Sequence, residues 1–214
     1  MVSISLRQIC LFFSEEVTED YGVIIIKALE EKILKEGKVL PGNVLKVDGF
    51  LNHRIDVAFI MEMGKEIAEL YKDSSVNKIL TIESSGIAIA FAAASFMNVP
   101  VVFAKKHKSS NISDNLYSSP VTSFTHNNTY NAVVSKDFLN KDDSVIIVDD
   151  FLARGNALRG LIDIVNQAGA ELIGCAIAIE KGFQNGGDEL RKQGVRIESL
   201  ALIDNMTEDS ITFR

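Results

Sequence analysis

The sequence contains little cysteine and little histidine, and it has no surplus of positive charge. Among its 214 residues there are two cysteines and three histidines, and the formal net charge is −7 at pH 7. A protein that binds nucleic acid over a broad surface normally shows a basic stripe or a basic excess. The composition therefore argues against a nucleic-acid platform, and any phosphate-binding site has to be local.

The cysteines and the lack of a long apolar run bear on the cellular compartment. Cys10 and Cys175 are far apart, and Cys175 lies in the apolar run 173–179, so we expect a reduced core thiol rather than a disulfide. No run approaches the roughly 18 consecutive apolar residues of a membrane-crossing helix. Acidic residues interrupt the apolar N-terminal stretch, unlike in a secretory signal. We therefore expect a soluble cytoplasmic protein.

The apolar patterning predicts an α/β fold. Hydrophobic residues make up 47% of the chain, which is enough to bury the core of one sizeable domain. Short β-rich apolar runs predict buried parallel strands, and two segments between them read as helices. The strands are expected at 78–83, 99–104, 144–150 and 171–180, and the helices at 86–98 and 155–169. This alternation predicts a doubly wound, mostly parallel sheet.

Two further elements are expected outside this alternation. Residues 118–135 read as a β-hairpin that turns near Asn127 and Asn128, preceded by a polar stretch at 105–117. Residues 26–37 read as an amphipathic helix closed by Gly37.

The stretch "VIIVDDFLARGNAL" places two carboxylates, Asp149 and Asp150, directly before a loop of small residues that opens a helix. In a doubly wound sheet the ligand lies outside the carboxyl ends of the strands. Three polar segments are expected to converge there, at 83–86, 105–108 and 149–157. The sequence therefore predicts a binding site at this edge of the sheet.

The chemistry of this site can be narrowed by elimination. The chain contains neither the G-x-x-x-x-G-K-[ST] motif of nucleoside triphosphatases nor the G-x-G-x-x-G motif of dinucleotide-binding folds. A ribose 5-phosphate fits what remains. Backbone N–H groups of residues 153–157 can hold the phosphate, while Asp149 and Asp150 can accept hydrogen bonds from the sugar hydroxyls or help to hold magnesium. The alternative is that the two aspartates merely end a strand and cap a turn.

The same stretch resembles the phosphoribosyl-diphosphate signature of the type I phosphoribosyltransferases. Other segments occur in the order typical of the bacterial xanthine phosphoribosyltransferases: "VLKVDGFLNHRID", "TIESSGIA", "VVFAKKHKS", "DNL" and "IEKGFQ". The resemblance covers roughly residues 26–211. It implies transfer of a phosphoribosyl group from phosphoribosyl diphosphate to xanthine, with Mg²⁺ bound alongside the diphosphate substrate. It also implies a homodimer and a small hood built from N- and C-terminal segments.

The resemblance and the chemistry of a diphosphate leaving group together predict the first half of the site. Asp149, Asp150 and Lys106 are the predicted catalytic residues. Phosphoribosyl diphosphate is expected to contact Ala153, Arg154, Gly155, Asn156, Ala157, Ser84, Ser85, Gly86, Lys105 and Lys108. The resemblance further implies a non-proline cis peptide in the turn 83–86. Loss of diphosphate leaves an oxocarbenium-like sugar that water would attack, so we expect a lid, at 106–118. Alternatively, the serines are an ordinary helix cap and the lysines a solvated charge run.

By resemblance, the base is expected to contact four residues. Lys181 meets the purine 6-oxygen, Asn52 and Leu45 line another edge, and Phe183 lies against the ring. An ammonium rejects adenine, whose 6-amino group is also a donor; the alternative is a surface lysine that ends a strand. Hypoxanthine-guanine enzymes carry an acid where this chain has Ala153. Xanthine loses a ring proton more readily, so positioning and the charge of Lys181 are expected to replace that acid.

Several questions stay open at the level of sequence. Arg154, where the family more often has an uncharged residue, can face either the 5-phosphate or water. Residues 1–25 are expected to be an extension to the catalytic domain 26–214: a partner-binding segment, an extra packed element, or the product of an upstream start codon. Two rival functions remain, a phosphoribosyl-diphosphate-sensing purine regulator and a sister enzyme for guanine, hypoxanthine or adenine. The regulator would need a basic winged-helix domain, for which the segment before Val44 is too short and too acidic.

Overall fold

The computed structural model describes residues 18–106, 115–123 and 128–214. Its centre is a six-stranded sheet with the order β10-β9-β8-β7-β3-β4. All strands pair in parallel except β10, which is antiparallel to β9. Their bounds are β3 Lys78–Ile82, β4 Val101–Ala104, β7 Ser144–Leu152, β8 Glu171–Lys181, β9 Ile197–Met206 and β10 Ile211–Phe213. The predicted doubly wound, mostly parallel sheet is confirmed, and β9 and β10 are additions that the sequence analysis did not assign.

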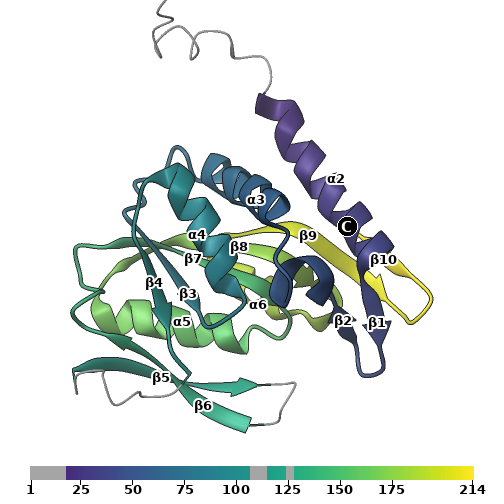
Figure 1. The fold of residues 1–214 in the computed structure, drawn as a ribbon. Helices are drawn as coiled ribbons and strands as arrows, with labels where there is room; N and C mark the ends of the chain where they lie inside the picture. Colours follow the sequence, from purple (N-terminus) through teal and green to yellow (C-terminus); the bar gives the residue numbers. More distant parts are fainter. Residues whose placement is uncertain (1–17, 107–114, 124–127) are drawn as a thin grey trace, which may run out of the picture.

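Helices cover both faces of the sheet (Figure 1). Helices α3 (Val57–Leu70) and α4 (Gly86–Met97) pack on one face, and α5 (Asn156–Ala168) packs on the other. Neighbouring strand residues alternate between the two cores: Ile79 and Ile146 join the α3–α4 cluster, whereas Leu80 and Ile147 join the α5 cluster. This alternation follows from the two-residue period of a strand, and it explains why the central strands are apolar on both sides.

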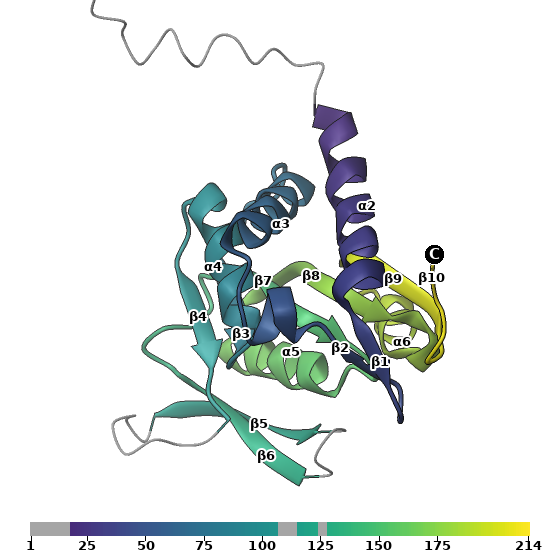
Figure 2. The same cartoon turned by 45° about the vertical axis from the view of Figure 1, so that its right-hand side comes forward.

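The hood is formed by an N-terminal group of elements beside β9 and β10 (Figure 2). It consists of α2 (Thr18–Glu36), β1 (Lys38–Leu40), β2 (Val44–Lys46) and the π-helix η1 (Asp48–Asn52). Ile25, Leu29 and Ile33 of α2 are buried at a spacing of four, as expected for an amphipathic helix. The predicted end at Gly37 is confirmed.

The predicted start of this helix, at residue 26, is wrong. The helix begins eight residues earlier, at Thr18. The predicted boundary between residues 25 and 26 therefore falls inside a continuous helix. Residues 1–17, with Cys10, lie outside the described part of the chain.

The predicted hairpin is confirmed, and its predicted turn falls largely outside the described residues. Strand β5 (Leu116–Ser123) pairs antiparallel with β6 (Asn128–Ser135) over its full length. Asn128 belongs to the second strand, so the connection comes before it, at 124–127, outside the described residues. The hairpin packs on α5, where Gln167 exchanges hydrogen bonds with the backbone of Ser118 in both directions.

The described residues also bear on the predicted free cysteine and on membrane-crossing helices. Cys175 is a buried, unbridged thiol, as predicted. None of the described helices combines the length and the apolar character needed to cross a membrane.

Candidate functional site

The two aspartates lie inside a strand rather than at its end. Strand β7 continues two residues past Asp150 to Leu152, and Asp149 is in register with Ile177 of β8. The alternative that the pair merely ends a strand is therefore wrong. Asp149 is only 6% exposed, and its Oδ1 accepts a hydrogen bond from the Asp150 backbone at 3.0 Å. Burial, and next the neighbouring charge of Asp150, raise the pKa of Asp149 well above its usual value.

Helix α4 begins directly over Asp149. The Glu83–Ser84 peptide is cis, as the resemblance implied. Ser85 stands at the N-cap but in helical conformation, and its hydroxyl makes no capping hydrogen bond, so the alternative of an ordinary serine cap is not supported. At Gly86 a Cβ atom would lie 2.9 Å from Asp149 Oδ1 and would also clash with the Thr81 hydroxyl. Glycine is thus required for the helix to approach the carboxylate this closely.

The lysines after β4 are held by specific contacts. Lys105 exchanges two backbone hydrogen bonds with Val133 of β6, at 3.0 and 2.9 Å. The Lys106 N–H donates to the Glu83 carboxylate, and its ammonium lies 5.7 Å from the centroid of the Tyr130 ring. Both side chains are half-buried, which does not fit a fully solvated charge run. Lys108 and most of the predicted lid, residues 107–114, lie outside the described part of the chain.

The loop residues predicted to bind phosphate form one wall of a pocket at the start of α5. Gly155 precedes the helix with φ of +80°, a conformation that favours glycine. The Asn156 side chain donates to the Thr122 carbonyl at 3.0 Å, which ties the loop to the hairpin. A pocket of about 170 Å³ lies between this loop and the hairpin and is lined by Thr122, Tyr130 and residues 151–158. Arg154 is exposed, while Ala153 and Ala157 are half-buried.

Lys181 lies where the hood meets the sheet. It ends β8, and its ammonium donates to the Asn43 carbonyl at 2.8 Å and lies 5.4 Å from the centroid of the Phe151 ring. Asn43 is in the turn between β1 and β2. Burial lowers the pKa of the Lys181 ammonium. These contacts argue against an ordinary surface lysine.

The other three residues predicted to contact the base differ in how far they are buried. Leu45 on β2 is 5% exposed and belongs to the main hydrophobic cluster, against which the half-buried Phe183 also packs. Asn52 is the last residue of η1 and is exposed. The structure therefore gathers hydrophobic side chains and one ammonium near the hood, with Asn52 available to solvent.

Sequence reasoning missed several residues that line or support the site. The Thr81 hydroxyl is buried beneath Gly86 without a hydrogen-bond partner among the described residues. A hydroxyl inside the apolar run "KILTI" is the feature of the sequence that could have identified Thr81. Tyr130 of β6 lines the phosphate-side pocket and faces Lys106. An ion pair between the buried Glu180 and the half-buried Arg191 supports the segment after β8.

The described residues contain no cluster of three or more histidine, cysteine, aspartate or glutamate side chains that could hold a metal ion. The aspartate pair therefore offers at most two carboxylate groups from this strand. Such a site fits a metal ion that arrives with oxygen ligands of its own, and it does not fit an all-protein cage.

Comparisons with known proteins agree with this geometry. A family model described as phosphoribosyl transferase domain matches residues 50–207. The chain is 54% identical over 190 residues to xanthine phosphoribosyltransferase 2 of Clostridium botulinum, covering 88% of this chain and all of that protein. It is also 54% identical to the xanthine phosphoribosyltransferase of Finegoldia magna over 188 residues, covering 88% of this chain and 99% of the relative.

Solved structures share the fold at lower identity. Adenine phosphoribosyltransferase of Trypanosoma brucei, in complex with AMP, pyrophosphate and ribose-5-phosphate, superposes with a TM-score of 0.68 at 21% identity, covering 81% of this chain and 78% of that chain. The enzyme of Giardia lamblia, in complex with 9-deazaadenine, gives a TM-score of 0.68 at 18% identity, covering 83% and 98%.

Proposed function

Because this chain belongs to the phosphoribosyltransferase family, we propose that it transfers the 5-phosphoribosyl group of phosphoribosyl diphosphate to xanthine. The products are xanthosine 5-monophosphate and diphosphate, so the reaction belongs to purine salvage. The observation that carries the reaction class is the aspartate pair of β7, one residue of it buried, directly ahead of a glycine-opened helix. The choice of xanthine follows the relatives at 54% identity, which the chain matches over nearly their whole length.

The sugar phosphate is proposed to bind along the carboxyl end of β7. The N–H groups at the start of α5 donate hydrogen bonds to the 5-phosphate, because a helix N-terminus offers unpaired donors and a favourable dipole. Asp149 and Asp150 accept hydrogen bonds from the sugar hydroxyls. The carboxylates thus face the sugar, and the loop faces the phosphate. The two negative charges do not oppose the anion, since they bind a different part of the same molecule.

The leaving diphosphate is proposed to sit between the α4 start and the end of β4. Residues 84–86 offer N–H and hydroxyl donors, and Lys105 and Lys106 offer positive charge. Lys106 also lies close enough for its charge to lower the pKa of Asp149, against the larger effect of burial. Positive charge at this position stabilises the diphosphate as the bond to the sugar breaks.

Mg²⁺ is proposed to arrive with phosphoribosyl diphosphate, held mainly by the oxygens of that substrate. Asp149 and Asp150 are the residues that would complete its coordination, directly or through water. The ion would supply neutralisation of the diphosphate charge. The chain's own part is to fix the sugar and to present donors to the departing group.

The base is proposed to contact Lys181, Leu45, Asn52 and Phe183. The Lys181 ammonium exchanges its contact with the Asn43 carbonyl for the purine 6-oxygen, which also strengthens binding of a xanthine that has lost a ring proton. The loop after Asp150 has Ala153 where an acidic residue would handle the purine proton. Positioning and the ammonium charge are therefore proposed to suffice.

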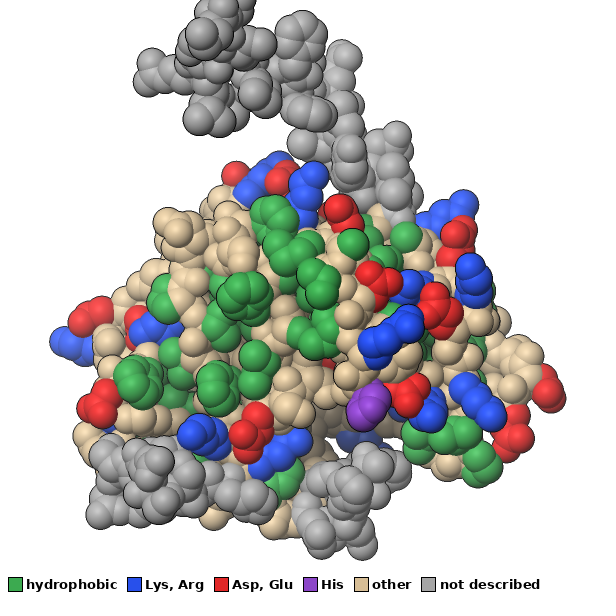
Figure 3. Space-filling view, viewed as in Figure 1, with side chains coloured by type: hydrophobic (Ala, Val, Ile, Leu, Met, Phe, Trp, Pro, Cys, Tyr) green, Lys and Arg blue, Asp and Glu red, His purple; other side chains and the backbone are tan. Residues whose placement is uncertain are grey.

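We further propose a cytoplasmic homodimer. The reduced, buried Cys175 suits a reducing compartment. Hydrophobic side chains gather on the surface formed by α3, α4 and β4 (Figure 3), where Phe91, Phe96 and Phe103 are 65%, 48% and 42% exposed. A contiguous apolar surface of this kind is typical of a protein interface.

The test is to incubate the protein with Mg²⁺, phosphoribosyl diphosphate and each of xanthine, guanine, hypoxanthine and adenine, and to identify the nucleotide formed. Xanthosine monophosphate should form fastest. The double variant Asp149→Asn, Asp150→Asn should fold and lose at least ~100-fold in turnover, because charge-assisted contacts to the sugar are removed. Preference for another base would indicate a sister enzyme, and no turnover with any base would indicate a regulator.

A further inference from the structure

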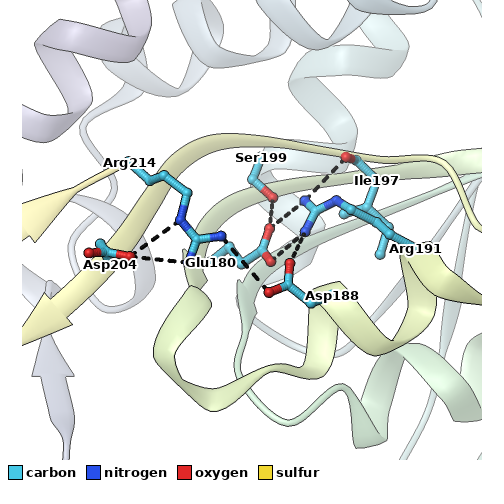
Figure 4. A network of polar contacts seen from close by, with 7 residues as sticks. All are labelled: Glu180, Asp188, Arg191, Ile197, Ser199, Asp204 and Arg214. Atoms are coloured by element: carbon cyan, nitrogen blue, oxygen red, sulfur yellow. Dashed lines mark hydrogen bonds and ion pairs between the residues drawn. The ribbon is translucent and has the colours of Figure 1, made fainter.

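The segment that follows β8 is bridged at its two ends by an ion pair of which one partner is buried. Glu180, next to last in β8, is 1% exposed and accepts two hydrogen bonds from Arg191 of α6 (Gly186–Lys192), at 2.8 and 2.7 Å (Figure 4). The Ser199 hydroxyl of β9 donates to the same carboxylate. A bidentate pair fixes the orientation of both groups as well as their distance.

Separating the Glu180 carboxylate from the Arg191 guanidinium would be energetically costly. Burial alone would raise the pKa of Glu180, but hydrogen bonds from Arg191 and Ser199 outweigh burial and hold the pKa below its usual value. The carboxylate is therefore ionised at neutral pH. Removing Arg191 would leave a buried charge without its main partner, which is strongly unfavourable.

Two glycines let the first turn of α6 contact both this carboxylate and the phosphate loop. A Cβ at Gly187 would overlap the Glu180 carboxylate. A Cβ at Gly186 would lie 2.5 Å from the carbonyl carbon of Arg154 and 2.7 Å from the nitrogen of Gly155. The turn is thus held between Glu180 on one side and the loop proposed to bind phosphate on the other.

Weaker contacts lie around the same segment, within α6 and between α6 and the C-terminal end of the chain. Asp188 lies 3.5 Å from Arg191 and 3.9 Å from Arg214, and Arg214 pairs with Asp204 at 3.1 Å. Gly182 packs against Leu202 so closely that a Cβ would lie 2.8 Å from its methyl group. At Gly182 the segment 181–187 therefore lies directly against β9.

We propose that Glu180 and Arg191 are positioning residues for the base. Their ion pair links the chain on both sides of the segment 181–187 and keeps Gly186 in contact with the proposed phosphate loop. The Lys181 ammonium and the Phe183 ring therefore keep a fixed place relative to the bound sugar. This role rests on the proposed function, because it assigns the base to the Lys181 side of the site. Small displacements of such groups weaken binding of the base, since productive geometry is narrow.

The test compares Arg191→Met and Arg191→Lys with Glu189→Gln. The control variant lies on the same helix and removes an exposed ion pair, between Glu189 and Arg159. In Arg191→Met the KM for xanthine should rise at least ~10-fold, while kcat and the KM for phosphoribosyl diphosphate change less than ~3-fold. Arg191→Lys keeps the charge but not the bidentate geometry, so it should rescue only part of the loss. Glu189→Gln should behave as wild type.

A second measurement does not depend on the substrate. Amide hydrogen exchange at residues 182–187 should be faster in Arg191→Met than in wild type or Glu189→Gln. A folded Arg191 variant with an unchanged KM for xanthine, or with equal losses for both substrates, would overturn the positioning role alone. If wild type forms no xanthosine monophosphate, the proposed function fails and the positioning role fails with it. Should Arg191→Met not fold, Arg191→Lys decides by the same two measurements.

Discussion

Asp149 combines burial with a second carboxylate as its immediate neighbour in the chain. Both conditions disfavour the ionised form, and the fold retains them although each costs stability. A buried carboxylate beside a second carboxylate is explained if it binds the hydroxyl groups of a ligand or a metal ion. Perturbed carboxyl groups of this kind are concentrated at functional sites.

Asp149→Asn should change how stability depends on pH. Between the usual aspartate pKa of 3.8 and the raised pKa, the folded protein keeps a proton that the unfolded chain releases. Wild-type stability should therefore fall as pH rises through this window, and the fall should be smaller in the variant. Thermal unfolding from about pH 4.5 to about pH 8 measures the difference. Asp142→Asn, an exposed aspartate just before β7, should keep the wild-type slope. Identical slopes for all three proteins would contradict a raised pKa at Asp149.

Lys181→Gln should affect base selectivity more than sugar binding. Glutamine keeps a donor but removes the charge, so catalytic efficiency with xanthine should fall more than ~10-fold, a cost of at least ~1.4 kcal/mol. Discrimination against neutral 6-oxopurines should shrink, because they depend less on the charge. Steady-state kinetics with each base, together with phosphoribosyl diphosphate binding in the absence of base, measure both effects. Lys192→Gln, on the exposed side of α6, is the control. A variant that loses affinity for phosphoribosyl diphosphate and keeps its base preference would place Lys181 on the phosphate side.

The residues proposed to contact the substrates were easier to predict than the residues that support them. Asp149, Asp150 and the loop before α5 follow from a motif with a stated mechanism, and the structure brings them together with the α4 start. Thr81, Glu180 and Arg191 could not be assigned, because their importance depends on partners in other elements. Glu180 and Ser199 are a clear example, since neighbouring strands bring together residues 19 positions apart.

At the scale of elements, α4 depends on one glycine for its position. Gly86→Ala should push the helix start away from Asp149, because the new methyl group would lie 2.9 Å from Oδ1 and against Thr81. Overpacking of this kind costs about 1–3 kcal/mol of folding free energy. Turnover should fall by more than the loss of stability explains, since the helix start also belongs to the proposed diphosphate site. Chemical denaturation and kinetics measure the two effects. Gly49→Ala, where a methyl group meets nothing within 4 Å, should change neither; equal behaviour of the two variants would contradict the packing argument.

Elements with many repeats of a clear pattern were mostly predicted, and three-residue elements were not. Four of the five parallel strands, α4, α5 and the hairpin were recognised in this way, whereas β9 was missed although it has ten residues. Strands β1, β2 and β10 have three residues each, too few for alternation to appear. Helix α3 could have been found, because Asp56 caps it and Ile60, Met63 and Ile67 follow at helical spacing. The hood as a unit depends on contacts such as Lys181 to Asn43, which join residues 138 positions apart.

At the scale of the whole molecule, one surface remains apolar after folding. The sheet buries its own faces under α3, α4 and α5, yet Phe91 and Phe96 of α4 and Phe103 of β4 are left 65%, 48% and 42% exposed. The net charge of −7 would keep separate copies apart, so association at this surface needs apolar contact. A twofold dimer would place the same patch on both partners and cover it.

The proposed homodimer predicts that this surface sets the oligomeric state. The double variant Phe91→Asp, Phe96→Asp places two charges on each of two symmetric copies, so four would be buried in the interface without partners. Its dimer dissociation constant should rise at least ~100-fold, which sedimentation equilibrium over a range of concentrations measures. Leu34→Asp, which changes a 57% exposed leucine on α2, should leave the constant unchanged. A wild-type protein that stays monomeric at every concentration would remove the dimer from the proposal. If instead the double variant dimerises as wild type does, a different surface makes the contact, and the exposed phenylalanines need another explanation.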